Sequence, residues 1–294
     1  MKQNLVILAL SAIALLGLPS CKTTSDSVPT TIVPKTVAKS TETSIKLGAS
    51  SSTLGLIKVL QTNYEATAKN VKITQLEPGK SENIIDGIKV RLVDIAAISQ
   101  ILKPGDNDGN LESLEVAHDA LVVATHSSVT GVKNLTTEDM KGIYSGTITN
   151  WQQLGGTDAK IVLLDRPEDE SAKRLLRKYY LGNDLKSSSE AVVFRKEGEL
   201  IEAIQSTPYS IGIFSLAHAI SHKLLVNRLS LNEVKPTQEN VKAGKYPMVR
   251  TISIVWHKNP TEATKGLIRY ISSPSAMNAM EQSGFISVAK SAKN

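Results

Sequence analysis

The chain has 294 residues, of which 41% are apolar and 21% charged, and 34 Lys and Arg residues stand against 28 Asp and Glu residues. This length allows one large domain or two of ordinary size, and the apolar fraction suffices for a folded core, which excludes wholesale disorder. A single cysteine excludes a disulfide framework and a four-cysteine zinc site.

The first 20 residues predict a lipoprotein signal peptide. Leu5 to Leu18 is an apolar stretch that is shorter than the roughly 20 residues a bilayer span needs, and it fits the core of a signal peptide. It runs into the sequence LPSC, which ends at Cys21 and resembles the lipobox of bacterial lipoproteins. The resemblance implies cleavage before Cys21 and lipidation of its thiol. The alternatives are a secreted protein with an unmodified cysteine and a helical anchor.

Residues 21–44 predict a flexible tether. Serine and threonine dominate this segment, two prolines interrupt it, and its few apolar residues follow neither a helical nor a strand period. Such a composition buries too little apolar surface to offset the entropy of ordering. The folded part of the chain is therefore expected to begin near Ser44.

From Ser44 onward, strand-like and helix-like patterns alternate, which favours an α/β architecture. The predicted strands cover 44–48, 71–74, 94–98, 119–125, 160–164, 210–214 and 251–256. The predicted helices cover 52–68, 81–91, 135–144, 168–180, 199–206, 261–272 and 274–283.

Three strand-to-helix junctions are rich in hydroxyl or charged residues: 48–53, 78–81 and 165–171. Helix N-termini offer unpaired N–H donors, and hydroxyls and Arg166 add further donors for an oxyanion. Ordinary N-capping explains a serine at any one helix start. Three such junctions in one α/β protein, where ligands sit beyond the carboxyl ends of strands, favour an anion site.

The stretch from Leu135 to Leu176, with the run IYSGTITNW, resembles the second-lobe signature of phosphate-type substrate-binding proteins of ABC importers. The segments GASSST, VDIAAIS, SIGIFSLAHA and PTQENVKAGKYPMVRTISIVW resemble other parts of that family in the right order. The resemblance implies a two-lobed, class II periplasmic-binding-protein-like fold. Lobe 1 would comprise 45–125 and 251–294, lobe 2 would comprise 126–250, and two crossing strands, at 122–125 and 252–255, would form the hinge.

The resemblance also implies a set of ligand-binding residues, with departures. The positions that match are Ser51, Ser52, Thr53, Ser81, Ser99 and Arg166. The Ser-Gly-Thr run that the family carries after its arginine is replaced here by Glu170, Ser171 and Ala172, and an arginine of the first lobe is replaced by Gln100. Glu170 and Ser171 remain candidates for the site.

The acidic run of Glu168, Asp169 and Glu170 is expected in the first turn of the helix over 168–180, where it complements the helix dipole. A carboxylate facing the cleft would oppose a bound anion. Either Glu170 points to solvent and Ser171 supplies the hydroxyl, or Glu170 accepts the proton of a protonated oxyanion, which admits phosphate and rejects sulfate. A third possibility is a ligand other than phosphate.

These features predict a binding protein and not an enzyme: an extracytoplasmic, lipid-anchored monomer that captures inorganic phosphate or a related oxyanion for an ABC permease. No cofactor, metal or nucleic-acid partner is expected, since His218 and His222 lack completing ligands, the cations are spread and aromatic residues make up 4%. The alternatives are a similar lipoprotein with a sensing or surface-interaction role and a secreted phosphatase. The membrane leaflet stays open.

Overall fold

The computed structural model describes residues 43–288. The predicted signal peptide, Cys21 and all but the end of the predicted tether lie outside the described residues. Strand β1 begins at Thr43, so residues 43 and 44 belong to the fold and not to the tether. Within 43–288, every helix is too short or too polar to cross a membrane.

Most predicted elements are present, with small shifts of their ends. The first group comprises β1 (Thr43–Ala49), α1 (Leu54–Thr67), β2 (Val71–Gln75), α2 (Ser81–Lys89), β3 (Ile95–Ile98) and β4 (Leu111–His126). The middle group comprises β5 (Asn134–Leu135), α3 (Thr137–Ser145), β6 (Val162–Asp165), α4 (Ser171–Leu176), β7 (Val192–Val193), α5 (Glu197–Ser206) and β8 (Ser210–Ser215). The last group comprises α6 (Leu216–Ser221), β9 (Val226–Arg228), β10 (Ser230–Leu231), α7 (Gln238–Lys242), β11 (Val249–His257), α8 (Glu262–Ile271), α9 (Pro274–Gln282) and β12 (Ile286–Ser287).

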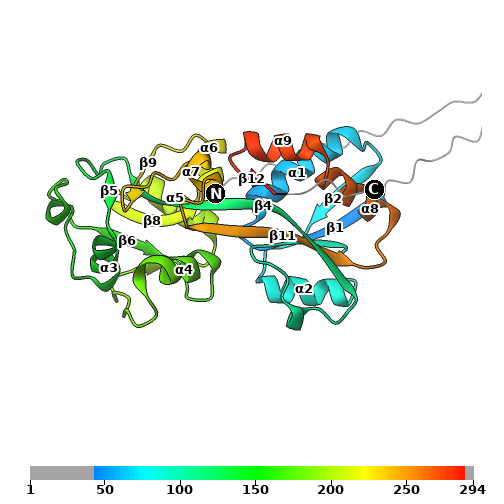
Figure 1. Cartoon of the computed structure of the whole chain (residues 1–294), viewed down its shortest axis with the longest axis horizontal. Helices are drawn as coiled ribbons and strands as arrows, with labels where there is room; N and C mark the ends of the chain where they lie inside the picture. The colour runs from blue at the N-terminus through cyan, green and yellow to red at the C-terminus, as the bar shows by residue number, and fades with distance from the viewer. Residues whose placement is uncertain (1–42, 289–294) are drawn as a thin grey trace, which may run out of the picture. The chain divides into compact units, whose positions relative to one another are not determined.

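The main sheet has the strand order β2-β1-β3-β11-β4-β8-β6-β7. The strands at each end of the sheet pair in parallel: β1 pairs with β2 and β3 at one end, and β6 pairs with β8 and β7 at the other. The long strands β4 and β11 are antiparallel to each other and join the two ends. Figure 1 shows β4 and β11 running between two groups of elements. The α/β, two-lobed fold predicted from the sequence is confirmed.

Strand β4 serves both lobes along its length. Residues 111–120 pair with β11, and residues 121–125 pair with β8 of the second lobe. Strand β11 in turn pairs with β3 of the first lobe through residues 253–256. The register between β11 and β4 shifts at Ile252/Ser253, a bulge in the segment where the chain passes from one lobe to the other. These two strands are therefore the connection about which the lobes can move.

The buried apolar residues form separate clusters. One cluster draws on residues 120–248 together with Ile286. A second draws on 45–117 and 252–285 together with Ala217, and a smaller third surrounds α2 and β3. Each lobe thus has its own core, as a hinged protein requires. The boundaries at 125/126 and 250/251 stay a prediction.

The prediction for 119–125 found only half of β4. Residues 111–118 include Glu112 and Glu115 on an exposed face, so this half lacks the apolar run by which the buried half is recognised. The short elements β5, β7, β9, β10, β12, α6 and α7 were not predicted. They contain two to six residues each, which is too few for a periodic pattern to show.

The predicted helix over 168–180 is wrong at its start. Helix α4 begins at Ser171, and a turn closed by the Glu170 N–H on the Pro167 carbonyl, at 3.0 Å, precedes it. Pro167 fixes its own backbone and disfavours helix at the residue before it, so the chain turns before the helix begins. The acidic run therefore lies before the helix and not in its first turn, and a π-helical segment (Arg177–Leu181) follows α4.

A buried ion network fastens the second lobe to the hinge strands. Arg250 of β11 is almost fully buried and binds the Asp119 carboxylate of β4 through Nη2 at 2.6 Å and Nε at 3.0 Å. Its Nη1 also donates to Glu197 of α5 at 2.7 Å. Ser215 completes the network, because its hydroxyl donates to Asp119 at 2.9 Å. Burial raises the pKa of Asp119 although Arg250 opposes it. At Glu197 burial also acts to raise the pKa, but Arg250, Arg166 and the Ser215 N–H together lower it.

Removing the arginine of this network should destabilise the protein strongly. In Arg250→Leu, two buried carboxylates lose their counter-charge, and the expected loss in the free energy of unfolding is about 3–5 kcal/mol. Urea denaturation of residues 43–288 measures it. The matched control is Arg269→Leu on the exposed face of α8, which should change stability by less than about 0.5 kcal/mol. A loss below about 1 kcal/mol in Arg250→Leu would show that the network is dispensable.

Candidate functional site

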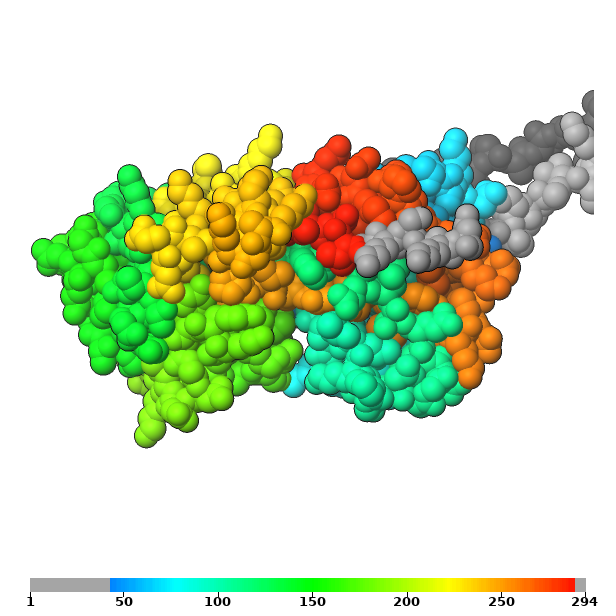
Figure 2. All heavy atoms as spheres, viewed as in Figure 1, coloured from blue at the N-terminus to red at the C-terminus, as the bar shows by residue number. Residues whose placement is uncertain are grey.

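A small cavity of about 30 Å³ lies between the two lobes. Five of the predicted residues line it: Ser51, Ser81, Ser99, Glu170 and Ser171. They come from the turns that follow β1, β2, β3 and β6, and the carboxyl ends of parallel strands are where α/β proteins place ligands. In Figure 2 the surface is hollowed between the light-green spheres of the second lobe and the blue-green spheres of the first.

Arg166 does not line this cavity, but it pairs with Glu170, which does, and it carries donors that lack acceptors. It follows β6 directly, its side chain is 3% exposed, and its Nη2 pairs with Glu170 Oε2 at 3.0 Å. Among the described residues, its Nε and Nη1 are buried without a hydrogen-bond partner. A buried donor left without an acceptor costs about 1–3 kcal/mol, and more when it is charged. Such an arrangement is stable only if an acceptor from outside the chain completes it.

Ser171 shows the same property at the cavity wall. It is the first residue of α4, its side chain is buried, and its Oγ has no partner within residues 43–288. The N-cap of α4 is Glu170, so the Ser171 hydroxyl is not required for capping. Ser171 therefore presents a free hydroxyl at the cavity that Glu170 and Ser81 also line.

Glu170 does not point to solvent. Its side chain is 17% exposed, its carboxylate pairs with Arg166, and it lines the cavity. The first of the two alternatives for this residue is therefore wrong in its orientation, although Ser171 does occupy a place from which its hydroxyl could serve a ligand. The carboxylate instead neutralises part of the Arg166 charge and stands as an acceptor beside the cavity.

Thr53 and Ser52 lie outside the cavity lining. The Thr53 hydroxyl donates to the carbonyls of Ser50 and Ala97 at 3.0 and 3.1 Å, so it fastens the turn before α1 to β3. Ser52 lines a larger hollow of about 450 Å³ beside α1, α5 and α6. His218 and His222 lie in that hollow with their rings stacked at 4.0 Å. Within the described residues, no group of three or more metal-ligating side chains accompanies them.

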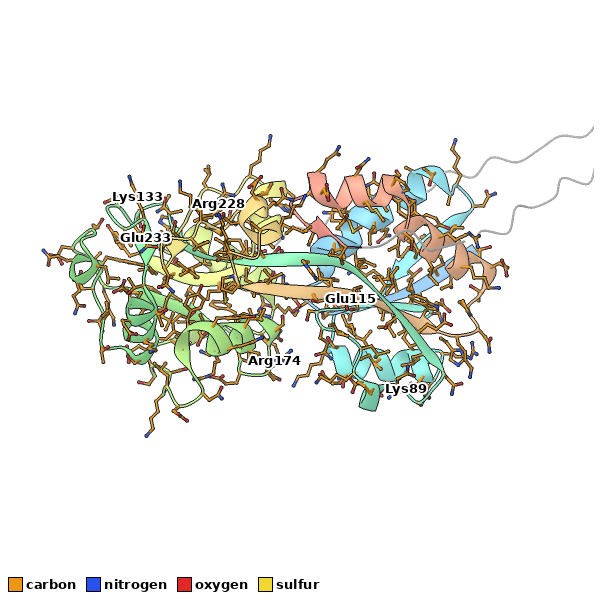
Figure 3. The ribbon with its side chains drawn as sticks, viewed as in Figure 1. Lys89, Glu115, Lys133, Arg174, Arg228 and Glu233 are labelled. Atoms are coloured by element: carbon orange, nitrogen blue, oxygen red, sulfur yellow. The ribbon has the colours of Figure 1, made fainter. Side chains whose placement is uncertain are left out.

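The sequence analysis did not single out an ion pair that crosses the cavity. Lys80, just before α2 in the first lobe, binds the Asp169 carboxylate in the second lobe, and Arg195 pairs with the same carboxylate at 3.2 Å. The hydrogen bond from Lys80 lowers the pKa of Asp169. Arg174 also lines the cavity, and Figure 3 places it at the side of the second lobe that faces the first. Lys80 and Asp169 are 89 positions apart in the chain, and no local sequence pattern predicts such a contact.

A second buried pair holds the Arg166 backbone in place. Asp165, at the end of β6, accepts the Arg166 N–H at 2.7 Å and binds the Lys173 ammonium from α4. Burial raises the pKa of Asp165, and Lys173 opposes that shift. Lys173 also lies over the Tyr144 ring at 4.8 Å. Glu168 is drawn away from the cavity by Arg177, whose hydrogen bonds at 2.7 Å lower the pKa of its carboxyl.

Fold and site together define a two-lobed α/β protein with a small cavity between the lobes. A family model described as a PBP superfamily domain matches residues 35–275, and the chain belongs to this superfamily. This agrees with the resemblance noted in the sequence.

Two proteins with sequence similarity are phosphate-binding proteins PstS. The one from Borreliella burgdorferi is 28% identical over 252 residues, which cover 83% of this chain and 90% of the relative. The one from Bacillus subtilis is 33% identical over 136 residues, which cover 45% of this chain and 44% of the relative. Among solved structures, a putative phosphate ABC transporter substrate-binding protein with bound phosphate from Clostridium perfringens matches with a TM-score of 0.74 and 24% identity. That match covers 83% of this chain and 99% of the other.

Proposed function

We propose that this chain is an extracytoplasmic substrate-binding protein that holds inorganic phosphate between its lobes and delivers it to an ABC permease. One observation carries the proposal: among the described residues, Ser171 Oγ at the wall of a cavity of about 30 Å³, and Nε and Nη1 of Arg166, which pairs with the cavity-lining Glu170, are buried without hydrogen-bond partners. That volume suits a small inorganic anion better than a sugar or a nucleotide. The names of the sequence relatives, both phosphate-binding proteins, support phosphate as the anion.

Binding rests on hydrogen bonds and charge without covalent chemistry. The Arg166 guanidinium offers donors in a planar fork that matches an oxyanion, and Ser51, Ser81, Ser99 and Ser171 surround the cavity with hydroxyls. Enclosure removes water, so each charge-assisted hydrogen bond is worth more than at an open surface. The Lys80–Asp169 pair joins the lobes across the cavity and favours the closed arrangement. No cofactor is needed for this task.

Removal of the unpartnered donors should weaken phosphate binding. Arg166→Gln is expected to lower the affinity at least about 100-fold, because each hydrogen bond to a charged group contributes about 1.5–3 kcal/mol. Ser171→Ala, which is compatible with a helix, should cost about tenfold. Calorimetric titration of phosphate-free protein 43–294 measures both affinities, and Arg269→Gln on α8 is the matched control.

Thermal unfolding of each variant establishes that it is folded, since Arg166→Gln leaves Glu170 without its cation. If the unaltered protein gives neither heat nor a thermal shift with millimolar phosphate, the phosphate assignment fails. If phosphate binds and both site variants bind it equally well, the cavity is the wrong site. Binding at this site without any transport would favour the sensing role.

Glu170 should determine selectivity between phosphate and sulfate. A carboxylate at the cavity accepts the proton that phosphate still carries near neutral pH and repels fully ionised sulfate. In Glu170→Gln, the ratio of phosphate to sulfate affinity is expected to fall at least about tenfold, which corresponds to about 1.4 kcal/mol. Competition calorimetry with both anions measures the ratio.

The control for this experiment is Glu138→Gln, an exposed carboxylate of α3 that does not line the cavity. It should leave the ratio unchanged. An unchanged ratio in Glu170→Gln would mean that this carboxylate receives no proton from the ligand, and the specificity of the site would then have another source.

We also propose that the chain is a monomeric lipoprotein anchored through Cys21, with the leaflet unassigned. The LPSC sequence and the apolar stretch before it support this. When the full chain is expressed in a bacterial host, an alkyne-tagged fatty acid should label it, and Cys21→Ser should abolish the label, because this is its only cysteine. Persistent labelling of the variant would refute lipidation at Cys21, and sedimentation of residues 43–294 tests the monomer.

A further inference from the structure

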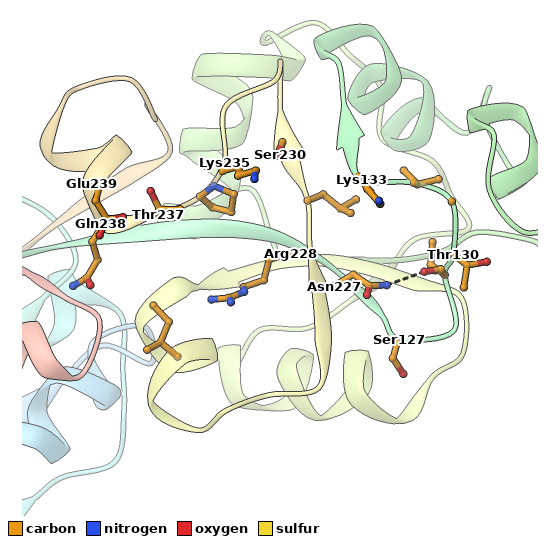
Figure 4. Close-up of a pocket in the computed structure, with 16 residues that line it drawn as sticks. Ser127, Thr130, Lys133, Asn227, Arg228, Ser230, Lys235, Thr237, Gln238 and Glu239 are labelled. Carbon is orange, nitrogen blue, oxygen red and sulfur yellow. Dashed lines mark hydrogen bonds between the residues drawn. The ribbon is translucent and has the colours of Figure 1, made fainter.

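A large hollow lies within the second lobe, away from the anion cavity. It is a groove of about 740 Å³, and none of its lining residues lines the anion cavity. Three segments and Ile220 of α6 form it: the segments are residues 127–133 between β4 and β5, residues 227–230 in and after β9, and residues 235–239 before and at the start of α7 (Figure 4). Figure 1 shows β9 and α7 on one side of β4 and β11, and α2 and α4 on the other.

Three cations surround this basic groove, one from each segment: Lys133, Arg228 and Lys235. All three are exposed, and within residues 43–288 none of them forms an ion pair. By contrast, Lys80 and Arg166 near the anion cavity are paired with carboxylates, and Arg174 donates to the Asp169 backbone carbonyl. The only acidic residue in the groove lining is Glu239. The groove therefore carries positive charge that the described part of the chain leaves uncompensated.

The walls of the basic groove are fixed by hydrogen bonds. Asn227 Nδ2 donates to the Val129 carbonyl at 2.8 Å, which joins β9 to the 127–133 segment (Figure 4). On the other wall, Gln238 Nε2 donates to the Phe285 carbonyl at 2.9 Å. Because the walls are held before any ligand arrives, a partner would not have to order them.

We propose that this basic groove docks an extended acidic segment of a partner protein. A single small anion gains little there, since an exposed cation contributes only about 0–1 kcal/mol to a pair in water. Three cations on three segments favour a ligand that carries several carboxylates along one chain and contacts them together. A groove of about 740 Å³ also has room for a short stretch of polypeptide.

Docking at the basic groove would leave the anion cavity accessible. Figure 3 places Lys133 and Arg228 on the opposite side of the lobe from Arg174, which lines that cavity. A partner seated at the groove therefore does not cover the space between the lobes. The proposal is independent of the identity of the anion.

The test uses fluorescein-labelled hexaglutamate and residues 43–294, measured by anisotropy at low and at physiological salt. The unaltered protein is expected to bind the peptide with an affinity that falls as salt rises. The triple variant Lys133→Gln, Arg228→Gln, Lys235→Gln should bind it at least about tenfold more weakly. The matched control, Lys69→Gln, Lys72→Gln, Arg269→Gln, removes the same charge from exposed positions of the first lobe and should bind within about twofold of the unaltered protein.

Three results would overturn the proposal. Equal loss in both triple variants would show a general effect of net charge. Displacement of hexaglutamate by phosphate would place the peptide in the anion cavity. Binding to anionic phospholipid vesicles that is lost in the groove variant, together with no binding of hexaglutamate, would indicate that the groove contacts a membrane. Phosphate calorimetry on the groove variant should be unchanged, so failure here is distinguishable from failure of the phosphate assignment.

Discussion

The buried contact between Arg250, Asp119 and Glu197 is the constraint on which the two-lobed arrangement depends. It joins both hinge strands to α5 of the second lobe, in a place where three charges would otherwise be desolvated without compensation. The geometry is specific, since Nη2 reaches both carboxylates at 2.6 and 3.0 Å. The backbone ladder sets the register of β4 and β11, and the network adds a fixed point where α5 of the second lobe meets these two strands.

The anion cavity follows from that arrangement. The turns after β1, β2 and β3 face the turn after β6 because parallel strands end at the same edge within each lobe. Charges near the cavity are largely cancelled: Glu168 is bound by Arg177, Asp169 by Lys80, and Glu170 by Arg166. What remains is a set of unpartnered donors on Arg166 and Ser171. On the proposed function, these donors and the Glu170 carboxylate, and not net charge, would set which anion the cavity selects.

The sequence was informative wherever a pattern was local. Buried strands, amphipathic helices and hydroxyl-rich turns are each visible in a few neighbouring residues, and five of the proposed ligand residues indeed line one cavity. It was uninformative where partners are distant. The first half of β4 is polar on one face, and the Lys80–Asp169 pair joins positions far apart in the chain. The resemblance in sequence implied that Thr53 binds the ligand. In the structure its hydroxyl donates to two backbone carbonyls, and the sequence pattern does not show these bonds.

Part of the positive charge of the chain lies in the basic groove, where Lys133, Arg228 and Lys235 stand against Glu239. Beside the anion cavity, cations and carboxylates alternate within ion pairs, so a ligand there meets little net field and is chosen at short range. In the basic groove, Lys133, Arg228 and Lys235 stand without such pairs, and their field extends into solvent to about the Debye length, roughly 8–10 Å. Hydrogen-bond donors that act at short range suit one small, enclosed anion. Exposed cations that form no ion pair, as in the basic groove, suit a larger acidic partner. A single protein can therefore present two anion-attracting regions that do not compete, because they act at different distances and on ligands of different size.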